Sequence, residues 1–388
     1  MQSKPSHVRC RVARLAVLMT ISALALNQHA SAQGFGALSL LFSPSAVANG
    51  MGNGFVAASL EASAIYYNPA ALSRLGRMAL EGNTFKLLPL FSDDARYRHF
   101  AGAYQISSTR GLWLGAAYTR AGYGKQSITD QDGQLLGEFE SYERVFALAA
   151  ATKLGQRSRF GAGFKIVHVN FGPVFGAADE KKNFDASAFA VDLGFLYEGF
   201  LPKAHFSKQF FGRPWPWHTW THKGLSPGFS LGIALMNVGA KLKFIDEAQG
   251  DPLPQSLRIG LAWNVFESDL LGLVGAGEFT KLLVKRDETG KADGALKALF
   301  TAWGDQSLRD EFSEAIFAGG VEVSFLQFAA LRFGRNWDGQ ADFGYNTIGY
   351  SIGPPGFRFS FAKYTPFRSF FIDEWRVYTV SITLDKLP

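Results

Sequence analysis

Apolar residues alternate with small or polar residues in short segments along most of this chain. Within residues 111–120, Leu114 and Tyr118 fall on one face of an extended backbone. Gly115 and Thr119 fall on the opposite face. A period of two residues indicates a β-strand with one apolar face.

Fourteen segments show this pattern, and we expect each to form a strand: 77–86, 97–106, 111–120, 142–152, 159–171, 184–197, 228–237, 255–265, 269–281, 315–324, 327–335, 343–353, 356–365 and 375–384. Many strands of about ten residues, without a long apolar run beyond the N-terminus, are typical of bacterial outer-membrane barrels, which favour an even strand number. The sequence therefore predicts an all-β fold, a transmembrane antiparallel β-barrel of about 14 strands over residues 77–388.

The expected connections alternate in length. The short ones are 107–110, 155–158, 267–268, 325–326 and 354–355, and the long ones are 121–141, 238–254 and 282–314. This alternation is expected when short turns face the periplasm and long loops face outward. One link breaks the rule, because residues 198–227 belong to the short series but interleave basic residues with Phe and Trp. Such a stretch suits a lipid headgroup zone, as a contact for a partner or lipid, or as an insertion that lies on the membrane.

The residues before the first strand divide into two parts. Residues 1–32 combine three arginines, a short apolar run over 15–26 and the small-residue site Ala30–Ala32, so they predict a cleavable export signal. Residues 33–76 lack a period of two. We interpret them as an N-terminal hatch inside the barrel, with short helices at 57–65 and 70–75.

The charge and cysteine content exclude several functions. The net charge is +6, but Lys4 and the three signal arginines account for four of these charges, which leaves about +2 after residue 32. This balance does not favour a nucleic-acid partner. The single cysteine, Cys10, lies in the predicted signal, so we expect no disulfide and no thiolate metal site.

Charged residues within the strand pattern are expected to point into the lumen, because a charge at the lipid midplane costs about 2–4 kcal/mol. The predicted lumen charges are Lys165, Asp192, Arg258, Glu322, Arg332 and Arg358. Both signs occur, which favours structural pairing that fastens the hatch or braces the wall. A solute pathway is the alternative, although selective pores more often carry rings of one sign.

Residues 46–72 resemble the N-terminal signature of FadL-like outer-membrane proteins, in particular its PorV/PorQ branch. The matching blocks are Gly50–Gly52, Phe55–Ala57 and Tyr67–Ala70, and the hatch motif comprises Gly50, Gly52, Gly54, Tyr67, Asn68 and Pro69. A second block around Asn237 and Arg258 is similar to the same branch. The resemblance implies a 14-stranded barrel with an N-terminal plug. We expect the motif to build that plug, with a ligand-binding role as the alternative.

Three local patterns invite catalytic or metal chemistry and do not support it. Ser230 fits a G-x-S-x-G pattern but lies within an expected strand rather than a strand-to-helix elbow. His218 and His222 have the spacing of metal ligands on a helix, but prolines precede them, so interfacial histidines are the better interpretation. The Gly50-x-Gly52-x-Gly54 run lacks the context of a phosphate loop. We therefore expect no enzyme activity, no cofactor and no metal.

The resemblance suggests two functions for a protein embedded in outer-membrane lipid. The function that we expect is a PorV-like role in type IX secretion, in which the barrel binds secreted cargo proteins or components of the secretion system. The alternative is a FadL-like passage for hydrophobic small molecules such as long-chain fatty acids. A purely structural barrel is a third hypothesis.

Overall fold

The computed structural model describes residues 35–89, 92–129, 132, 134–175, 181–200, 225–244, 250–267, 270–287, 290–303, 308–339, 341–354, 356–367 and 375–384. The predicted export signal, residues 1–32, lies outside these ranges. So do residues 201–224 of the aromatic and basic link, including His218 and His222.

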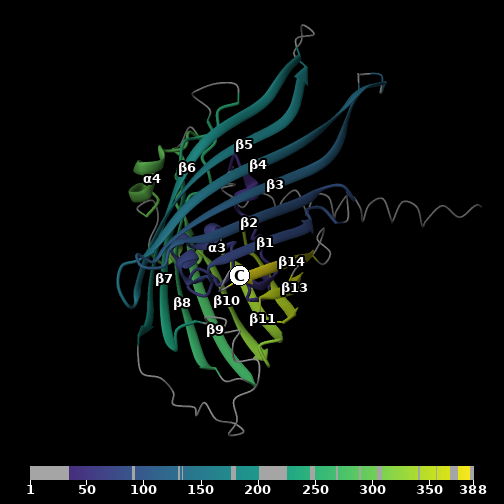
Figure 1. Ribbon diagram of the computed structural model, residues 1–388. Helices are drawn as coiled ribbons and strands as arrows, with labels where there is room; N and C mark the ends of the chain where they lie inside the picture. Colours follow the sequence, from purple (N-terminus) through teal and green to yellow (C-terminus); the bar gives the residue numbers. More distant parts are fainter. Residues whose placement is uncertain are drawn as a thin grey trace, which may run out of the picture. The chain divides into compact units, whose positions relative to one another are not determined.

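The described residues form fourteen strands that close into one barrel (Figure 1). The strands are β1 (Met78–Lys86), β2 (Arg96–Ser107), β3 (Leu112–Thr129), β4 (Leu135–Lys153), β5 (Ser158–Phe175), β6 (Lys181–Phe200), β7 (Gly228–Gly239), β8 (Ser256–Glu267), β9 (Leu271–Leu282), β10 (Ile316–Phe325), β11 (Ala329–Asp338), β12 (Phe343–Ile352), β13 (Phe357–Pro366) and β14 (Trp375–Leu384). Each strand pairs antiparallel with its sequence neighbours, and β14 closes the barrel against β1 from Met78↔Leu384 to Phe85↔Val377. The predicted fold class and strand number are confirmed.

The β3–β4 and β5–β6 hairpins are longer than the sequence pattern indicates, and the difference is larger in β3–β4. We expected a loop over 121–141, but β3 and β4 continue to Thr129 and from Leu135. Where the hairpin extends beyond the apolar band, polar residues occur on both of its faces, so the alternation of apolar and polar residues is lost. Cross-strand charge contacts extend the ladder instead, as between Arg120 and Glu140, whose closest nitrogen and oxygen are 2.8 Å apart. The expected loop over 121–141 is therefore wrong, whereas five connections at the other end are short, as expected.

The outer face of the barrel is apolar. Phe100, Phe146, Leu148, Phe164 and Phe189 are among many large apolar side chains on this face that are exposed. Their strand neighbours, which point inward, are mostly small or polar. Such a surface is stable only against lipid, so the barrel spans a membrane.

Among the described residues, no helix has both the length and the apolar character needed to cross a bilayer.

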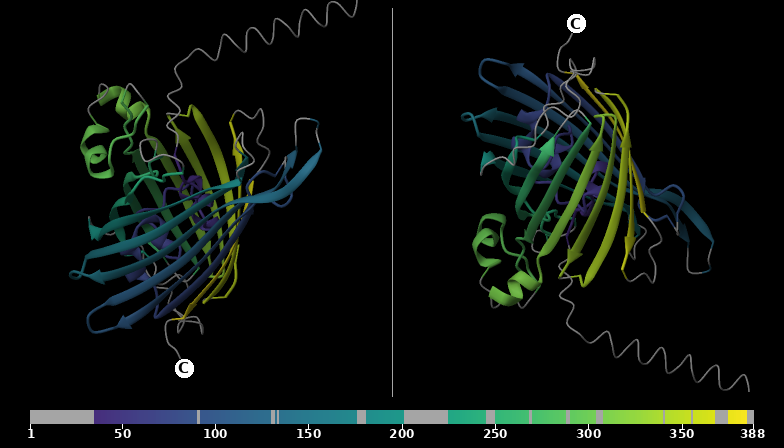
Figure 2. Two further views of the ribbon diagram at one scale, coloured as in Figure 1. Left: turned by 90° about the horizontal axis from the view of Figure 1, so that it is seen from above. Right: turned by 90° about the horizontal axis from the view of Figure 1, so that it is seen from below.

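Residues 35–76, named here the N-terminal segment, lie inside the barrel, where Figure 2 shows them in purple between the strands. Their short helices are η1 (Leu38–Leu40), α2 (Ala46–Gly50), α3 (Ala64–Tyr67) and η2 (Pro69–Arg74). Helix α2 contacts β11 to β14, and η2 contacts β3 to β6 on another part of the wall. The segment therefore joins separate parts of the barrel wall across the lumen.

The helix expected over residues 57–65 is wrong, because the helix there begins only at Ala64. The guanidinium of Arg74 accounts for part of the difference. It donates to the carbonyl oxygen of Ala57 at 2.6 Å and to that of Ser59 at 3.3 Å. These carbonyls are bonded by a side chain instead of by the amides four residues later.

Glycines in the wall let the backbone of the N-terminal segment approach the strands closely. A Cβ atom added to Gly320 would lie 2.7 Å from Cα of Met51, and one added to Gly232 would lie 2.6 Å from the carbonyl oxygen of Val56. A Cβ atom on Gly161 would overlap Pro69 and Ala70. The wall and the segment therefore pack backbone against backbone, which only glycine permits at these positions.

This packing predicts that Gly161→Ala destabilises the protein by about 1–3 kcal/mol, the usual cost of overpacking. The matched control is Gly275→Ala, because a Cβ atom there meets no atom within 4 Å. We expect the control to change stability by less than about 0.5 kcal/mol. Thermal unfolding followed by heat-modifiable gel mobility measures both, and equal melting of the two variants would contradict close docking at Gly161.

Candidate functional site

Buried glutamates of the wall bind backbone amides of the N-terminal segment. One carboxylate oxygen of Glu278, on β9, accepts hydrogen bonds from the amides of Phe55 and Val56, both at 2.8 Å. Glu81, on β1, accepts from the amide of Ser63 at 2.8 Å. Hydrogen bonds to a charged acceptor are stronger than neutral ones, and an unsatisfied amide in a buried site is costly.

Glu143, on β4, holds the start of the segment in the same way. Its carboxylate accepts from the amides of Ser39 at 2.7 Å and Leu38 at 3.2 Å, and from the hydroxyl of Tyr123 at 2.7 Å. Three strands far apart in the barrel thus each present a carboxylate to the segment. Because the segment has little regular helix, its amides depend on these external acceptors.

A fourth glutamate fastens the end of the segment through arginines. The Nε atom of Arg74 lies 2.5 Å from Oε1 of Glu198, and Arg159 bonds the other oxygen of the same carboxylate. Arg159 also donates to the carbonyl oxygen of Ser73 at 2.6 Å. Arg74 and Glu198 are buried, so the loss of either partner would leave a buried charge without compensation.

The glycines of the predicted hatch motif lie against β10, β11 and β12. The carbonyl oxygen of Gly50 accepts from Thr347, and that of Gly52 accepts from Asn336, each at 3.1 Å. Gly52 has a φ of +65°, which a side chain would strain, and Gly54 packs against the wall backbone. These glycines turn the chain tightly beside the wall.

The second half of the motif is also bonded. The hydroxyl of Tyr67 lies 2.5 Å from Oγ of Ser43 and accepts from the amide of Ser45 at 3.2 Å. Asn68 accepts from the amide of Ala70 and donates to two carbonyl groups, each at 3.1 Å. Pro69 follows as the first residue of η2. The bonds of Asn68 explain why an Asn–Pro pair suits this turn.

Lys165, Asp192 and Asn237 form one buried cluster. The Lys165 ammonium lies 2.9 Å from Oδ2 of Asp192 and donates to Oδ1 of Asn237 at 2.6 Å. Asn237 has a φ of +59° and sits at an irregularity in the β6–β7 pairing, where its amide donates to Asp192 at 2.7 Å. The Asn237 block of the sequence thus forms a bulge that a buried ion pair stabilises.

The remaining predicted lumen charges differ in their partners. Arg332 donates to Glu322 at 2.6 Å and to the hydroxyl of Ser351 at 2.6 Å. Arg258 lies 3.9 Å from Glu278. Within the described residues, Arg358 has no hydrogen bond or ion pair, although it faces the same interior.

The four glutamates that bind the segment were missed by the sequence analysis: Glu81, Glu143, Glu198 and Glu278. Their signal was present, because each alternates with outward-facing residues, as Glu278 does with Phe279. Their partners could not be predicted, because the partners are backbone groups of an irregular segment.

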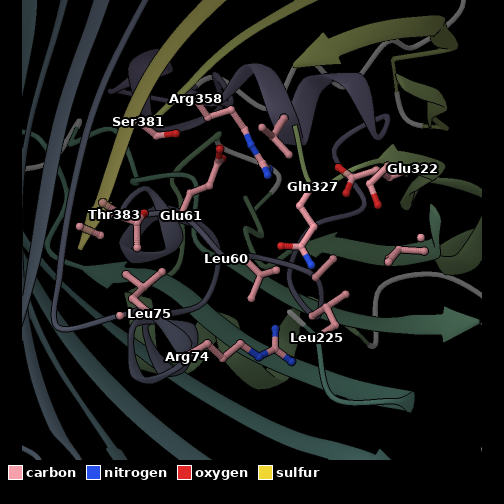
Figure 3. A pocket seen from close by; sticks show the side chains of 18 of the residues that line it. Leu60, Glu61, Arg74, Leu75, Leu225, Glu322, Gln327, Arg358, Ser381 and Thr383 are labelled. Carbon is pink, nitrogen blue, oxygen red and sulfur yellow. The ribbon is translucent and has the colours of Figure 1, made fainter. Parts of the chain in front are cut away.

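A cavity opens beneath the N-terminal segment, at the barrel end that carries the short connections. The space open to water-sized molecules is about 160 Å³, which is room for roughly ten waters. Apolar side chains from the segment and the wall line it, among them Val47, Met51, Leu60, Leu75, Phe266 and Val274. Glu61, Gln327 and Arg358 extend into the same space (Figure 3).

Glu61 belongs to the N-terminal segment and bonds the hydroxyl of Ser45. Burial, together with the nearby Glu81 carboxylate, raises the pKa of Glu61 to about 8. The Ser45 hydrogen bond and the charges of Arg332 and Arg358 oppose this rise. Glu61 is therefore mostly protonated, and neutral, at pH 7. It does not neutralise the positive charge of Arg358.

The structure places Ser230, the candidate catalytic serine of the sequence, whereas His218 and His222 lie outside the described residues. Ser230 is buried within β7 and not on a strand-to-helix elbow. Within the described ranges, no group of three or more His, Cys, Asp or Glu side chains could hold a metal ion.

No protein-family model matches the chain. No curated protein matches it either.

Solved structures similar to this chain include the toluene transporters TodX of Pseudomonas putida and TbuX of Ralstonia pickettii. TodX has 13% identity and a TM-score of 0.49, over 88% of this chain and 98% of TodX. TbuX has 14% identity and a TM-score of 0.46, over 88% of this chain and 98% of TbuX. A FadL homologue of Pseudomonas aeruginosa has 10% identity and a TM-score of 0.45, over 91% of this chain and 99% of that structure.

The role of Glu278 in holding the N-terminal segment is tested by Glu278→Gln in a protein that also carries Ser59→Cys and Cys10→Ser. Ser59 is fully buried, so a thiol introduced at this position reports opening of the segment through its rate of maleimide labelling. A hydrogen bond to a charged group contributes about 1.5–3 kcal/mol, so we expect labelling to accelerate about 10- to 100-fold.

The control is Glu138→Gln, which removes an exposed carboxylate whose closest cation is 4.0 Å away. Such a surface pair contributes little, so labelling should match the parent. Equal rates in the two variants would show that Glu278 does not hold the segment.

Proposed function

We propose that this protein is a non-enzymatic outer-membrane barrel of FadL-like type that binds and passes hydrophobic solutes with an anionic headgroup, such as long-chain fatty acids. The N-terminal segment acts as its hatch. The observation that carries the proposal is the cavity beside the segment, which combines an apolar lining with Arg358, an arginine that forms no hydrogen bond or ion pair with the described residues.

The charges around the cavity explain why an anion is expected. Glu322 lines the cavity but is bonded to Arg332, and Arg74 is bonded to Glu198. Glu267 lies exposed and accepts from Asn264 at 3.2 Å. Arg358 is therefore the cavity's available cation, and a carboxylate would give it the bidentate partner that arginine prefers.

The apolar lining provides the second half of the recognition. Most ligand pockets are apolar surfaces with a few placed polar groups. A fatty acid matches this combination, because its carboxylate meets Arg358 while its chain lies against leucine, methionine and phenylalanine side chains.

The PorV-like secretion hypothesis stays a prediction from the sequence. Its main motivation, the link over 198–227, lies largely outside the described residues. The Asn237 and Arg258 block, its other motivation, has structural partners within the barrel. We therefore favour the solute-binding function.

Arg358→Gln tests the headgroup site. We expect laurate to bind the variant about 10- to 100-fold more weakly than the parent, because a hydrogen bond to a charged group is lost. Dodecanol has the same chain and no charge, so its affinity should change little. Calorimetric titration of the detergent-solubilised protein measures both ligands.

Arg358→Lys serves as the matched control, because it keeps the charge and should retain most of the laurate affinity. Unfolding of Arg358→Gln should match the parent, since Arg358 bonds no described residue. Equal laurate affinity in the parent and in Arg358→Gln would overturn the proposed site.

The protonation of Glu61 predicts a pH dependence. Ionisation above about pH 8 places a negative charge beside Arg358, whereas laurate stays ionised throughout this range. Laurate affinity should therefore fall between pH 7 and pH 9 in the parent. In Glu61→Gln the side chain stays neutral, and the same titrations should show a constant affinity; a parallel fall in both proteins would contradict the role of Glu61.

A further inference from the structure

The connection between β9 and β10 carries two short helices, α4 (Ala295–Thr301) and α5 (Leu308–Ser313), which lie outside the barrel wall (Figures 1 and 2). Helix α5 packs against the outer side of β9. The ring centroids of Phe312 and Phe279 are 5.5 Å apart, and Phe279 is 5.6 Å from Phe317 on β10. The apolar surface of α5 is thus continuous with the lipid-facing band.

An ion pair confirms that α5 covers the outer wall. Lys281 points outward, two residues after Phe279 on the same face of β9. It is nevertheless buried and bonded to Glu311 of α5. An outward lysine can be buried there only because the helix lies over it.

Helix α4 exposes large apolar side chains and buries small ones. Ala298 of the helix and Ala302, which directly follows it, are buried, whereas Leu296 and Phe300 are 72% and 79% exposed. A helix that packs on a protein in water buries its large apolar residues and exposes its small or polar ones. The reversed order indicates that an apolar medium covers Leu296 and Phe300.

We propose that α4 and α5 dip into the acyl region of the adjacent membrane leaflet and anchor the β9–β10 connection to the lipid. Phe312 is also 57% exposed, next to the lipid-facing band. Leu296, Phe300 and Phe312 together present far less surface than a stable protein interface, which needs about 20–30 residues on each side. A few apolar side chains are sufficient for shallow insertion at a membrane interface.

Single cysteines labelled with the fluorophore NBD test the proposal in a Cys10→Ser protein reconstituted into phosphatidylcholine vesicles. The probes are Leu296→Cys and Phe300→Cys, and the matched control is Lys297→Cys on the same helix. The Lys297 side chain is 67% exposed, so all three positions accept a label without disturbing the core. Phe164→Cys on the barrel wall provides the lipid-exposed reference.

Vesicles with brominated acyl chains should quench NBD at positions 296 and 300 at least half as strongly as at position 164. Aqueous iodide should quench position 297 at least twofold more strongly than position 300. Strong iodide quenching at 296 and 300 would overturn the proposal, because these side chains would then face water. Protection from both quenchers would also overturn it, because a protein partner or a second copy would then cover the helices.

Discussion

A backbone amide or carbonyl at membrane depth must find a partner within the protein or in enclosed water, because lipid offers none. The barrel meets this requirement for its fourteen described strands by pairing β14 with β1. The same requirement extends to the N-terminal segment, which is enclosed by the wall and has only short helices. Its amides are bonded by carboxylates of the wall, notably Glu278, Glu143 and Glu81. The charged interior of the barrel is therefore, in large part, the counterpart of an irregular backbone.

The barrel itself could be predicted from the sequence, because its signal is local. Outward residues such as Leu261 and inward residues such as Arg258 alternate within a single strand, so neither needs a distant partner to be recognised. The full length of the β3–β4 hairpin was not predicted, because the hairpin extends beyond the apolar band and its sequence there no longer alternates. Which charge pairs with which could not be predicted, because the pairing depends on contacts between residues far apart in the sequence, as between Lys165 and Asn237.

The N-terminal segment shows a different limit of sequence analysis. Its motif could be recognised as a compact, glycine-rich turn, whereas the glycines that receive it, such as Gly320 and Gly161, lie in the wall and look like ordinary strand residues. The helix expected over 57–65 begins only at Ala64, in part because Arg74 bonds two of the carbonyls that a longer helix would use. The glycine contacts join the wall to the segment, and the Arg74 contacts lie within the segment, so no local pattern encodes either of them.

Pairing and solute binding, which the sequence offered as alternatives for the lumen charges, are compatible in this structure. Glu322, Arg332, Lys165 and Asp192 form ion pairs that brace the interior. Arg358 is left facing a partly apolar cavity. Displacing the whole segment would leave several buried carboxylates without partners, at a cost of several kcal/mol. We therefore expect a bound solute to shift the segment locally rather than to expel it.

Hydrogen–deuterium exchange of the protein in lipid nanodiscs tests the central claim, that wall carboxylates hold the N-terminal segment inside the barrel. Peptides that contain the amides of Ser39, Phe55, Val56 and Ser63 should exchange about as slowly as those of the strands. Exchange of these peptides within seconds, beside fully protected strands, would contradict it.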